Sequence, residues 1–180
     1  MNASSLLRTI ALVGLVPLAV TGCGGDSSAG DAQTPPQGQA AMKAWLLEGN
    51  YKKWHCETAA HDARPPSPHG VNRICSNDLL SATAAGANYP AESAGVKELW
   101  DMVGGKVMGY AVYLKLANDS AAGANWYYYE DSPAINPMGG VFADGVGTSG
   151  NPKTVCVGCH MATGIDAMHS GHDFVYTQVK

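Results

Sequence analysis

The sequence predicts an α+β fold, in which a few helices pack around a predominantly antiparallel β-sheet. Segments with strand-like alternation outnumber those with helical periodicity, and no long crossover helix separates one strand from the next. The chain has 180 residues, of which 46% are hydrophobic and 14% are charged. These values are ordinary for one folded domain and argue against wholesale disorder.

Helical periodicity is clearest near the start of the predicted domain. Leu47, Tyr51 and Trp54 recur at i, i+4 and i+7, which predicts a helix over residues 41–54 with these side chains on its apolar face. The segment 64–70 (RPPSPHG) follows and cannot be helical, because proline lacks the backbone donor that a helix needs.

Residues 106–116 show the clearest strand pattern. Met108, Tyr110 and Val112 begin an alternation of large apolar residues with smaller or polar ones. The other expected elements are a strand at 71–76, a short helix at 79–85 capped by Ser76 or Asn77, a strand or helical turn at 96–100, a strand at 126–130, a short strand near Val141 and a closing strand at 174–179.

The first 22 residues have the layout of a secretory signal peptide. Arg8 precedes an apolar run over residues 10–20, which is too short to cross a bilayer stably. The run ends in Val20-Thr21-Gly22-Cys23, which resembles the bacterial lipobox, where the cysteine is lipidated and becomes the new N-terminus. The alternatives are an ordinary signal peptide followed by a free cysteine, and an uncleaved single-span anchor.

Lipidation of Cys23 would anchor the mature protein stably in the cell envelope, because several acyl chains hold far better than one. Gly24, rather than aspartate, follows the cysteine, and the resemblance to bacterial lipoproteins then implies the outer membrane, facing the periplasm. The segment 24–40 contains no large apolar side chain, so we expect residues 23–40 to form a flexible tether and residues 41–180 to form the domain.

Net charge limits the partners of the mature chain. Removal of the signal peptide removes Arg8 and leaves 10 basic against 15 acidic residues, a net charge of −5. An acidic chain with scattered lysines is not expected to bind nucleic acid as its main partner.

Four cysteines remain in the domain, and two of them form a cofactor-attachment motif. Residues 156–160 read C-V-G-C-H, the signature of covalent c-type haem. The thiols of Cys156 and Cys159 lie one helical turn apart, where they can add to the two vinyl groups of one porphyrin, and His160 is then placed as the axial ligand of the iron. A thioredoxin-like redox pair and a zinc site are the alternatives, but no βαβ pattern and no second ligand pair accompany the motif.

Cys56 and Cys75 are then left over, in a chain that we expect to be exported to an oxidising compartment. A structural disulfide joining the first helix to the first strand is the simplest assignment. The alternative is metal binding by Cys56 together with His55 or His61.

The order of the motifs resembles that of the cytochrome P-460 family, which includes the cytochromes c′-beta. The resemblance covers residues 41–180 and rests on GNYKKW (49–54), SPHG (67–70), Asn77, VKEL (96–99), GYAV (109–112), WYYY (126–129), CVGCH (156–160) and DFVY (173–176). Apart from the haem motif, each segment is weak by itself, but their order is specific.

The resemblance implies a compact, largely antiparallel β domain, often a homodimer, with one pentacoordinate haem c. The open distal face would bind nitric oxide or oxidise hydroxylamine, and electrons would pass to a redox partner such as another cytochrome. Lys97 matches the lysine that P-460 enzymes bond to a meso carbon of the haem, which alters its electronics. The alternative is a solvated lysine at a strand edge.

Catalysis would also need a distal group that moves protons from the nitrogen substrate. Between the aromatic strand and the haem motif the sequence offers Glu130, Asp131 and Asp144, none of them in a convincing motif. Whether the protein is an enzyme therefore stays open.

The sequence offers further candidates for the haem pocket. Tyr128 faces opposite Tyr127 and Tyr129 and could line the pocket, and Met138 and Phe142 could form an apolar cap. The candidate sixth ligands of the iron are His69, His169, His172, Met161 and Met168.

Three hypotheses follow from the sequence. The first is an exported, lipid-anchored P-460-type cytochrome that handles a small nitrogen species. The second is a periplasmic electron-transfer cytochrome with six-coordinate haem. The third is a lipoprotein without haem, held by two disulfides, Cys56–Cys75 and Cys156–Cys159.

Overall fold

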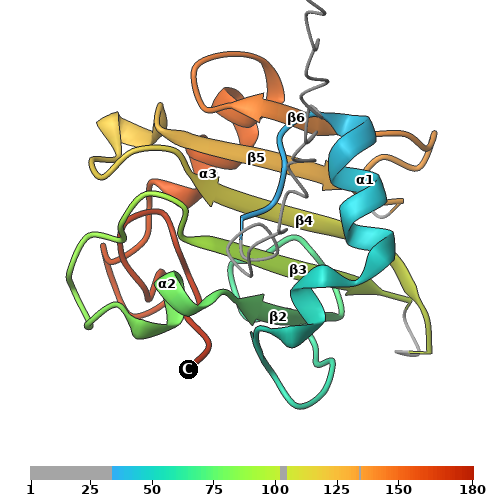
Figure 1. Ribbon diagram of the computed structural model, residues 1–180, viewed down its shortest axis with the longest axis horizontal. Coiled ribbons are helices and arrows are strands. Elements are labelled where there is room, and N and C mark those ends of the chain that lie inside the picture. The colour runs from blue at the N-terminus through green and yellow to red at the C-terminus, as the bar shows by residue number, and fades with distance from the viewer. Residues whose placement is uncertain (1–33, 102–104, 134) are drawn as a thin grey trace, which may run out of the picture.

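Six antiparallel strands form one sheet, and their order in space follows their order in the chain (Figure 1). The computed structural model describes residues 34–101, 105–133 and 135–180. The strands are β1 (His55–Cys56), β2 (Asn72–Ser76), β3 (Ala94–Trp100), β4 (Val107–Lys115), β5 (Trp126–Asp131) and β6 (Ala143–Val146). The predicted α+β class and the antiparallel sheet are confirmed, and the segment 96–100 is a strand.

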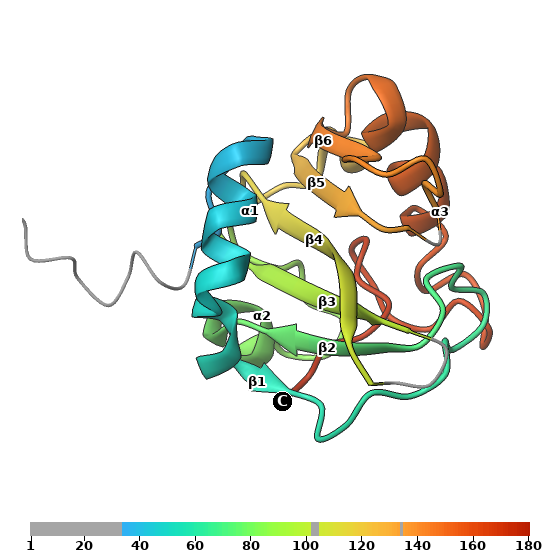
Figure 2. The ribbon, with the colours of Figure 1, turned by 90° about the vertical axis from the view of Figure 1, so that its right-hand side faces the viewer.

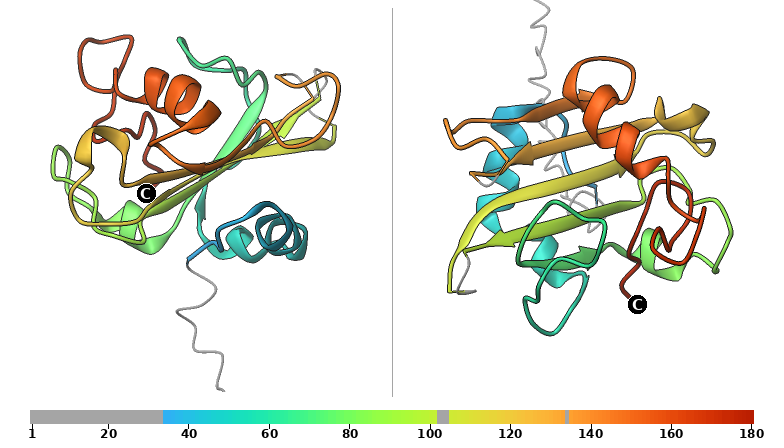
Figure 3. Two further views of the ribbon diagram at one scale, coloured as in Figure 1. Left: turned by 90° about the horizontal axis from the view of Figure 1, so that it is seen from above. Right: turned by 180° about the vertical axis from the view of Figure 1, so that it is seen from behind.

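Helical segments cover both faces of the sheet (Figures 2 and 3). Helix α1 (Gln39–Glu48) lies across one face, and the opposite face carries the helical segment formed by η3 (Pro152–Val157) and α3 (Gly158–His160), followed by the C-terminal residues. The short elements η1 (Asn50–Lys53), α2 (Asp78–Ala82) and η2 (Ala121–Gly123) connect the strands or flank them.

Strand β5 shows how alternation separates the two faces. Tyr127 and Tyr129 belong to the buried cluster under α1, whereas Trp126 and Tyr128 belong to a second cluster with Cys156. Successive side chains of a strand point to opposite faces, so the sequence WYYY supplies aromatic rings to both cores. The prediction that Tyr128 faces opposite its neighbours is confirmed.

Helix α1 begins at Gln39, inside the predicted tether, and ends earlier than expected. Gly49 adopts φ 73°, a left-handed conformation that ends helices, and a 3₁₀ turn follows it. Because the helix type changes at Gly49, residues before and after it do not continue one helical face. Leu47 is therefore 70% exposed, whereas Trp54 is buried. The predicted placement of Leu47 on the apolar face is therefore wrong.

The predicted signal peptide and the predicted lipidation site, Cys23, lie outside the described residues, as does most of the predicted tether. Within the part of the chain that the structure describes, no helix combines the length and the apolar character that crossing a bilayer requires.

The C-terminal segment runs beside the sheet without adding a strand to it. Gln178 Nε2 donates to the backbone carbonyl oxygens of Leu80 and Thr83, both at 2.7 Å, and the Val179 amide donates to Ser76 Oγ at 3.0 Å. Hydrogen bonds that involve side chains thus stand in place of the backbone bonds between strands. The prediction of a closing strand at 174–179 is therefore wrong. The cap of α2 was predicted: Asn77 Oδ1 accepts from the Leu80 amide at 3.0 Å.

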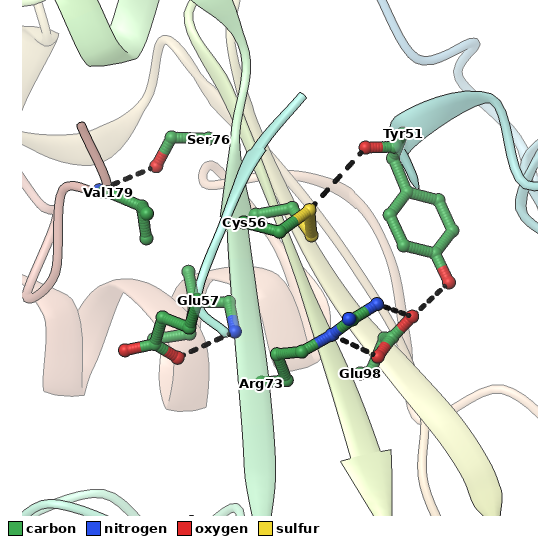
Figure 4. The surroundings of a disulfide bond; sticks show 9 residues. Tyr51, Cys56, Glu57, Arg73, Ser76, Glu98 and Val179 are labelled. Atoms are coloured by element: carbon green, nitrogen blue, oxygen red, sulfur yellow. Dashed lines mark hydrogen bonds and ion pairs between the residues drawn. A yellow bond between two sulfur atoms is a disulfide. The ribbon is translucent and has the colours of Figure 1, made fainter. Parts of the chain in front are cut away.

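A disulfide joins Cys56 to Cys75, as predicted (Figure 4). The two residues lie directly opposite each other on β1 and β2, so the bond links two strands and not a helix and a strand. The sequence did not predict β1, which is only two residues long. The alternative of metal binding by Cys56 is wrong, because its sulfur is bonded to Cys75.

A buried charge cluster lies close to this disulfide, under α1 (Figure 4). Glu98 is 1% exposed and accepts from Arg73 Nε at 2.8 Å, from Arg73 Nη2 at 3.0 Å and from the Tyr51 hydroxyl at 2.6 Å. Every charge in the cluster has a hydrogen-bonded partner, as burial requires.

Replacing Cys56 and Cys75 together by serine should lower the free energy of unfolding by about 2–4 kcal/mol, because the crosslink restricts the unfolded chain. Urea unfolding of the oxidised protein measures the difference. The reduced wild type serves as the control and should unfold at the midpoint of the variant. Equal midpoints for the variant and the oxidised wild type would contradict the expected stabilisation.

Candidate functional site

The C-x-x-C-H motif lies on a short helical segment packed against the sheet. The segment starts at Pro152, has π-helical geometry up to Val157 and ends as an α-helical turn at His160. Proline is favourable in a first turn, and π-helical turns are frequent at functional sites. Cys156 and Cys159 follow each other by three residues on this helix, so both thiols lie on one side of it.

The two thiols are free. Cys156 is buried and Cys159 is half-buried, and no disulfide joins them. Burial raises the pKa of the Cys156 thiol to about 12, so it stays protonated at neutral pH. The predicted alternative with a Cys156–Cys159 disulfide is therefore wrong.

The His160 ring is held by one backbone carbonyl. Its Nδ1 lies 2.6 Å from the Phe174 carbonyl oxygen, which can only accept, so Nδ1 carries the proton. Burial lowers the pKa of His160 to about 3, against the opposing effect of this hydrogen bond. The ring is therefore neutral, and Nε2 keeps the lone pair that a metal ligand needs.

Three tyrosines surround the His160 ring. The ring centroids of Tyr128, Tyr176 and Tyr113 lie 5.4, 5.5 and 6.2 Å from that of the imidazole. Tyr113 has room because Gly95 stands opposite it on β3, where a Cβ would come within 2.2 Å of the phenol. These aromatic contacts fix the orientation of the imidazole from several sides.

A cavity with two adjoining parts lies between the haem-motif helix and the sheet. The two parts contain about 500 and 570 Å³ of space between atoms, part of which is open to solvent. Both parts are lined by the same five residues, Pro68, His69, Lys97, Cys159 and His160. The axial-ligand candidate and the predicted crosslinking lysine therefore face one space.

Strand register explains how the floor of this cavity forms. Lys97 on β3 pairs with Ala111 on β4, and Ala111 pairs with Glu130 on β5. Directly paired residues point to the same face, so a small alanine separates two charged side chains whose backbones lie on the order of 10 Å apart. β3 is an inner strand and Lys97 is half-buried, so the alternative of a solvated lysine at a strand edge is wrong.

Glu130 and His69 form a polar pair in the cavity. His69 Nδ1 lies 3.2 Å from Glu130 Oε1, and their side chains are 12% and 5% exposed. Burial, followed by the charge of Lys97, lowers the pKa of His69 despite the opposing effect of Glu130. Burial likewise lowers the pKa of Lys97, to about 8, although Glu130 acts in the opposite direction.

The other two acid–base candidates lie on the α1 side of the sheet. Asp131 accepts from the Tyr129 hydroxyl at 3.0 Å and Asp144 accepts from the Gln39 amide at 2.8 Å. Asp144 also accepts from the Tyr127 hydroxyl. Both carboxylates hold the fold together and neither lines the cavity.

Of the five candidate sixth ligands, only His69 lines the cavity. Met161 and Met168 are each 62% exposed, the His172 ring stacks on Tyr89, and His169 Nδ1 lies 2.8 Å from Asp166. The predicted apolar cap is wrong as well: Met138 is 96% exposed, and Phe142 lines neither part of the cavity.

The residues present fit a haem c. Two free thiols lie on one helical turn, a neutral imidazole follows them, and all three residues line the adjoining cavity. In addition, the buried Tyr128 hydroxyl lines the cavity and has no hydrogen-bond partner among the described residues. Buried polar groups are normally paired, so a group bound in the cavity would supply the missing partner.

Comparisons with protein-family models, with curated proteins and with solved structures each found no match to this chain. The resemblance described above therefore stays a prediction. What sequence reasoning missed at the site is the pairing of His69 with Glu130. The register of β3, β4 and β5, which aligns Lys97 and Glu130 on one face, could have singled out Glu130, but not its contact with His69 in the Pro-rich loop.

Proposed function

We propose that the mature chain is an exported monohaem c-type cytochrome of the P-460 type that oxidises a small nitrogen species such as hydroxylamine. The observation that carries the proposal is the meeting of the C-x-x-C-H helix with Lys97, Glu130 and His69 around one cavity. A haem bound there would supply an iron that binds the nitrogen species and takes up its electrons one at a time.

Three residues would hold the haem. Cys156 and Cys159 would each form a thioether, and His160 Nε2 would coordinate the iron. The Nδ1–H bond to Phe174 orients the imidazole and increases the basicity of its other nitrogen.

Glu130 and His69 would handle protons. Each electron removed from hydroxylamine leaves together with a proton, so the reaction needs an acceptor within the cavity. Glu130 is the carboxylate that the cavity offers, and His69 Nδ1 lies 3.2 Å from it. The lowered pKa of His69 keeps its ring neutral at physiological pH. Once Glu130 is protonated, a ring with its proton on Nε2 can accept the carboxyl proton at Nδ1 and release its own from Nε2 towards solvent.

The Cys56–Cys75 disulfide supports an oxidising compartment such as the periplasm, since disulfides do not normally persist in the cytosol. Cys23 would attach the mature chain to the outer membrane. An exported redox protein, such as another cytochrome, would accept the electrons.

Lys97 is proposed to bond to the haem, and its substitution tests this. In the ferrous holoprotein we expect a markedly red-shifted Soret band, which Lys97→Arg should abolish because a guanidinium does not replace the amine nucleophile. Lys153→Arg, an exposed lysine on the same helix as the haem motif, is the control and should keep the shift. Persistence of the red shift in Lys97→Arg would contradict the assignment.

The same spectra distinguish the electron-transfer alternative, for which His69 is the sixth ligand that the cavity offers. Under our proposal the ferrous protein binds nitric oxide at an open position, and His69→Ala leaves the coordination number unchanged. An ordinary six-coordinate spectrum that does not respond to nitric oxide, and that becomes five-coordinate in His69→Ala, would favour electron transfer.

A further inference from the structure

A buried ion pair lies on the same face of the sheet as the cavity, but outside it. Lys115 Nζ lies 2.5 Å from Asp173 Oδ2, and the two side chains are 0% and 6% exposed. The ammonium group also lies 5.4 Å from the ring centroid of Trp126. Removing two charges from water is unfavourable, so a pair of this kind is weak evidence for stability and calls for another role.

Asp173 anchors the C-terminal segment to three separate parts of the chain. Besides Lys115 on β4, it accepts from the Ser120 hydroxyl and, at 2.9 Å, from the Tyr89 backbone amide. Its burial works to raise the pKa of Asp173, but the hydrogen bonds from Lys115 and Ser120 hold it below its usual value. The carboxylate is therefore ionised at neutral pH and fixed in place.

The backbone at this anchor has an uncommon conformation. Asp173 and Phe174 have φ angles of 47° and 67°, a left-handed region that residues other than glycine rarely adopt and bulky ones especially avoid. Such conformations persist only where surrounding contacts hold them, and they are common at functional sites. The three contacts of the Asp173 carboxylate and the bond from the Phe174 amide to Thr163 Oγ1, at 3.0 Å, are positioned to do so.

This turn directs the Phe174 carbonyl at the His160 ring. The carbonyl oxygen accepts from His160 Nδ1 at 2.6 Å. Asp173 immediately precedes Phe174, so a movement of its carboxylate would rotate the peptide that carries this acceptor. The Phe174 ring also packs on Trp126, at 6.3 Å between centroids, which ties the same turn to the aromatic residue beside Lys115.

We propose that the Lys115–Asp173 pair positions the Phe174 carbonyl against His160 and thereby sets the reduction potential of the bound iron. The inference rests on the proposed function, because it needs an iron on His160 Nε2. A short bond from Nδ1–H to a fixed acceptor increases the electron donation of the ring. Stronger donation stabilises the ferric state, which carries the higher charge, so the native pair keeps the potential low. Lys115 and Asp173 are positioning residues in this scheme.

The test is the reduction potential of the purified holoprotein, together with the iron–histidine stretching frequency of the ferrous state. In Asp173→Asn the potential should become more positive and the stretching frequency should fall. We expect the ferric-to-ferrous equilibrium to change roughly tenfold, the lower limit usual for outer-shell changes, which is about 59 mV for one electron. Ser120→Ala, which removes one donor to Asp173, should shift both quantities in the same direction by less.

Glu98→Gln is the matched control. It neutralises an equally buried, ion-paired carboxylate on the α1 face of the same sheet and should leave both quantities unchanged. If Asp173→Asn does not fold, Ser120→Ala and Glu98→Gln are compared instead. A change of reduction potential and stretching frequency in Ser120→Ala but not in Glu98→Gln would support the positioning role.

Two results would overturn the inference, and they are distinguishable. If Asp173→Asn or Ser120→Ala unfolds at a lower temperature but keeps the wild-type potential and stretching frequency, the pair is only structural, while the proposed function stands. If the wild-type protein binds no haem, the proposed function fails, and the positioning role fails with it.

Discussion

Serine at both Cys156 and Cys159 is expected to abolish covalent haem attachment. A hydroxyl does not replace a thiol in the addition to a porphyrin vinyl group, so any haem left in the double variant would be held by His160 and the cavity alone. Acid–acetone extraction should then remove all of the haem absorbance from the double variant and none from the wild type. Each single variant keeps one thioether and should keep its haem through extraction.

The matched control uses the other cysteine pair. Replacing Cys56 and Cys75 by serine removes the same number of cysteines from the chain, but these sulfurs form the disulfide on the α1 side and contact the cluster under that helix. The control should lose stability and keep its covalent haem. Covalent haem in the Cys156 and Cys159 double variant would contradict the assignment of the motif.

Glu130→Gln should lower the turnover of hydroxylamine oxidation by roughly 10²–10⁴-fold, the range typical of a lost general base. Glutamine has nearly the same volume and still offers an oxygen to His69, so the substitution removes the proton acceptor and little else. Affinity for nitric oxide should stay close to that of the wild type, since nitric oxide brings no proton. The measurement is steady-state oxidation with an artificial electron acceptor.

Asp144→Asn is the control for this prediction. Asp144 is another carboxylate of the sheet, but it is exposed and lies on the α1 face, where it accepts from the Tyr127 hydroxyl and the Gln39 amide. Its loss should reduce stability and leave turnover unchanged. A Glu130→Gln variant with wild-type turnover would show that the carboxylate is not the proton acceptor, and it would favour reversible binding of nitric oxide over oxidation.

Local sequence patterns predicted most of the sheet. The alternation at Val112 and Leu114 and the aromatic run from Trp126 depend on neighbouring residues, and both segments form strands as expected. The predicted strand at 174–179 failed because distant groups decide that region. Asp173 and Phe174 turn away into left-handed conformations, held by Lys115 and by His160, and no local pattern reports such contacts.

The candidate site, like the sheet, has one part that local sequence predicts and another that depends on distant residues. The C-x-x-C-H motif is contained in five consecutive residues, so its spacing alone predicts the placement of both thiols and the imidazole. The pairing of His69 with Glu130 spans 61 residues and depends on strand register and on a Pro-rich loop. Periodicity within a segment does not contain that information, and for this reason Glu130 did not stand out from Asp131 and Asp144.

Covalent haem is the central claim, and the mass of the purified protein tests it most directly. The protein should be weighed in its native state and again after denaturation. We predict that the mass of one haem is added to the chain and remains after denaturation, because two thioethers survive unfolding. A denatured chain with no added haem mass would contradict both cytochrome hypotheses and, with them, the assignment of Cys156, Cys159 and His160.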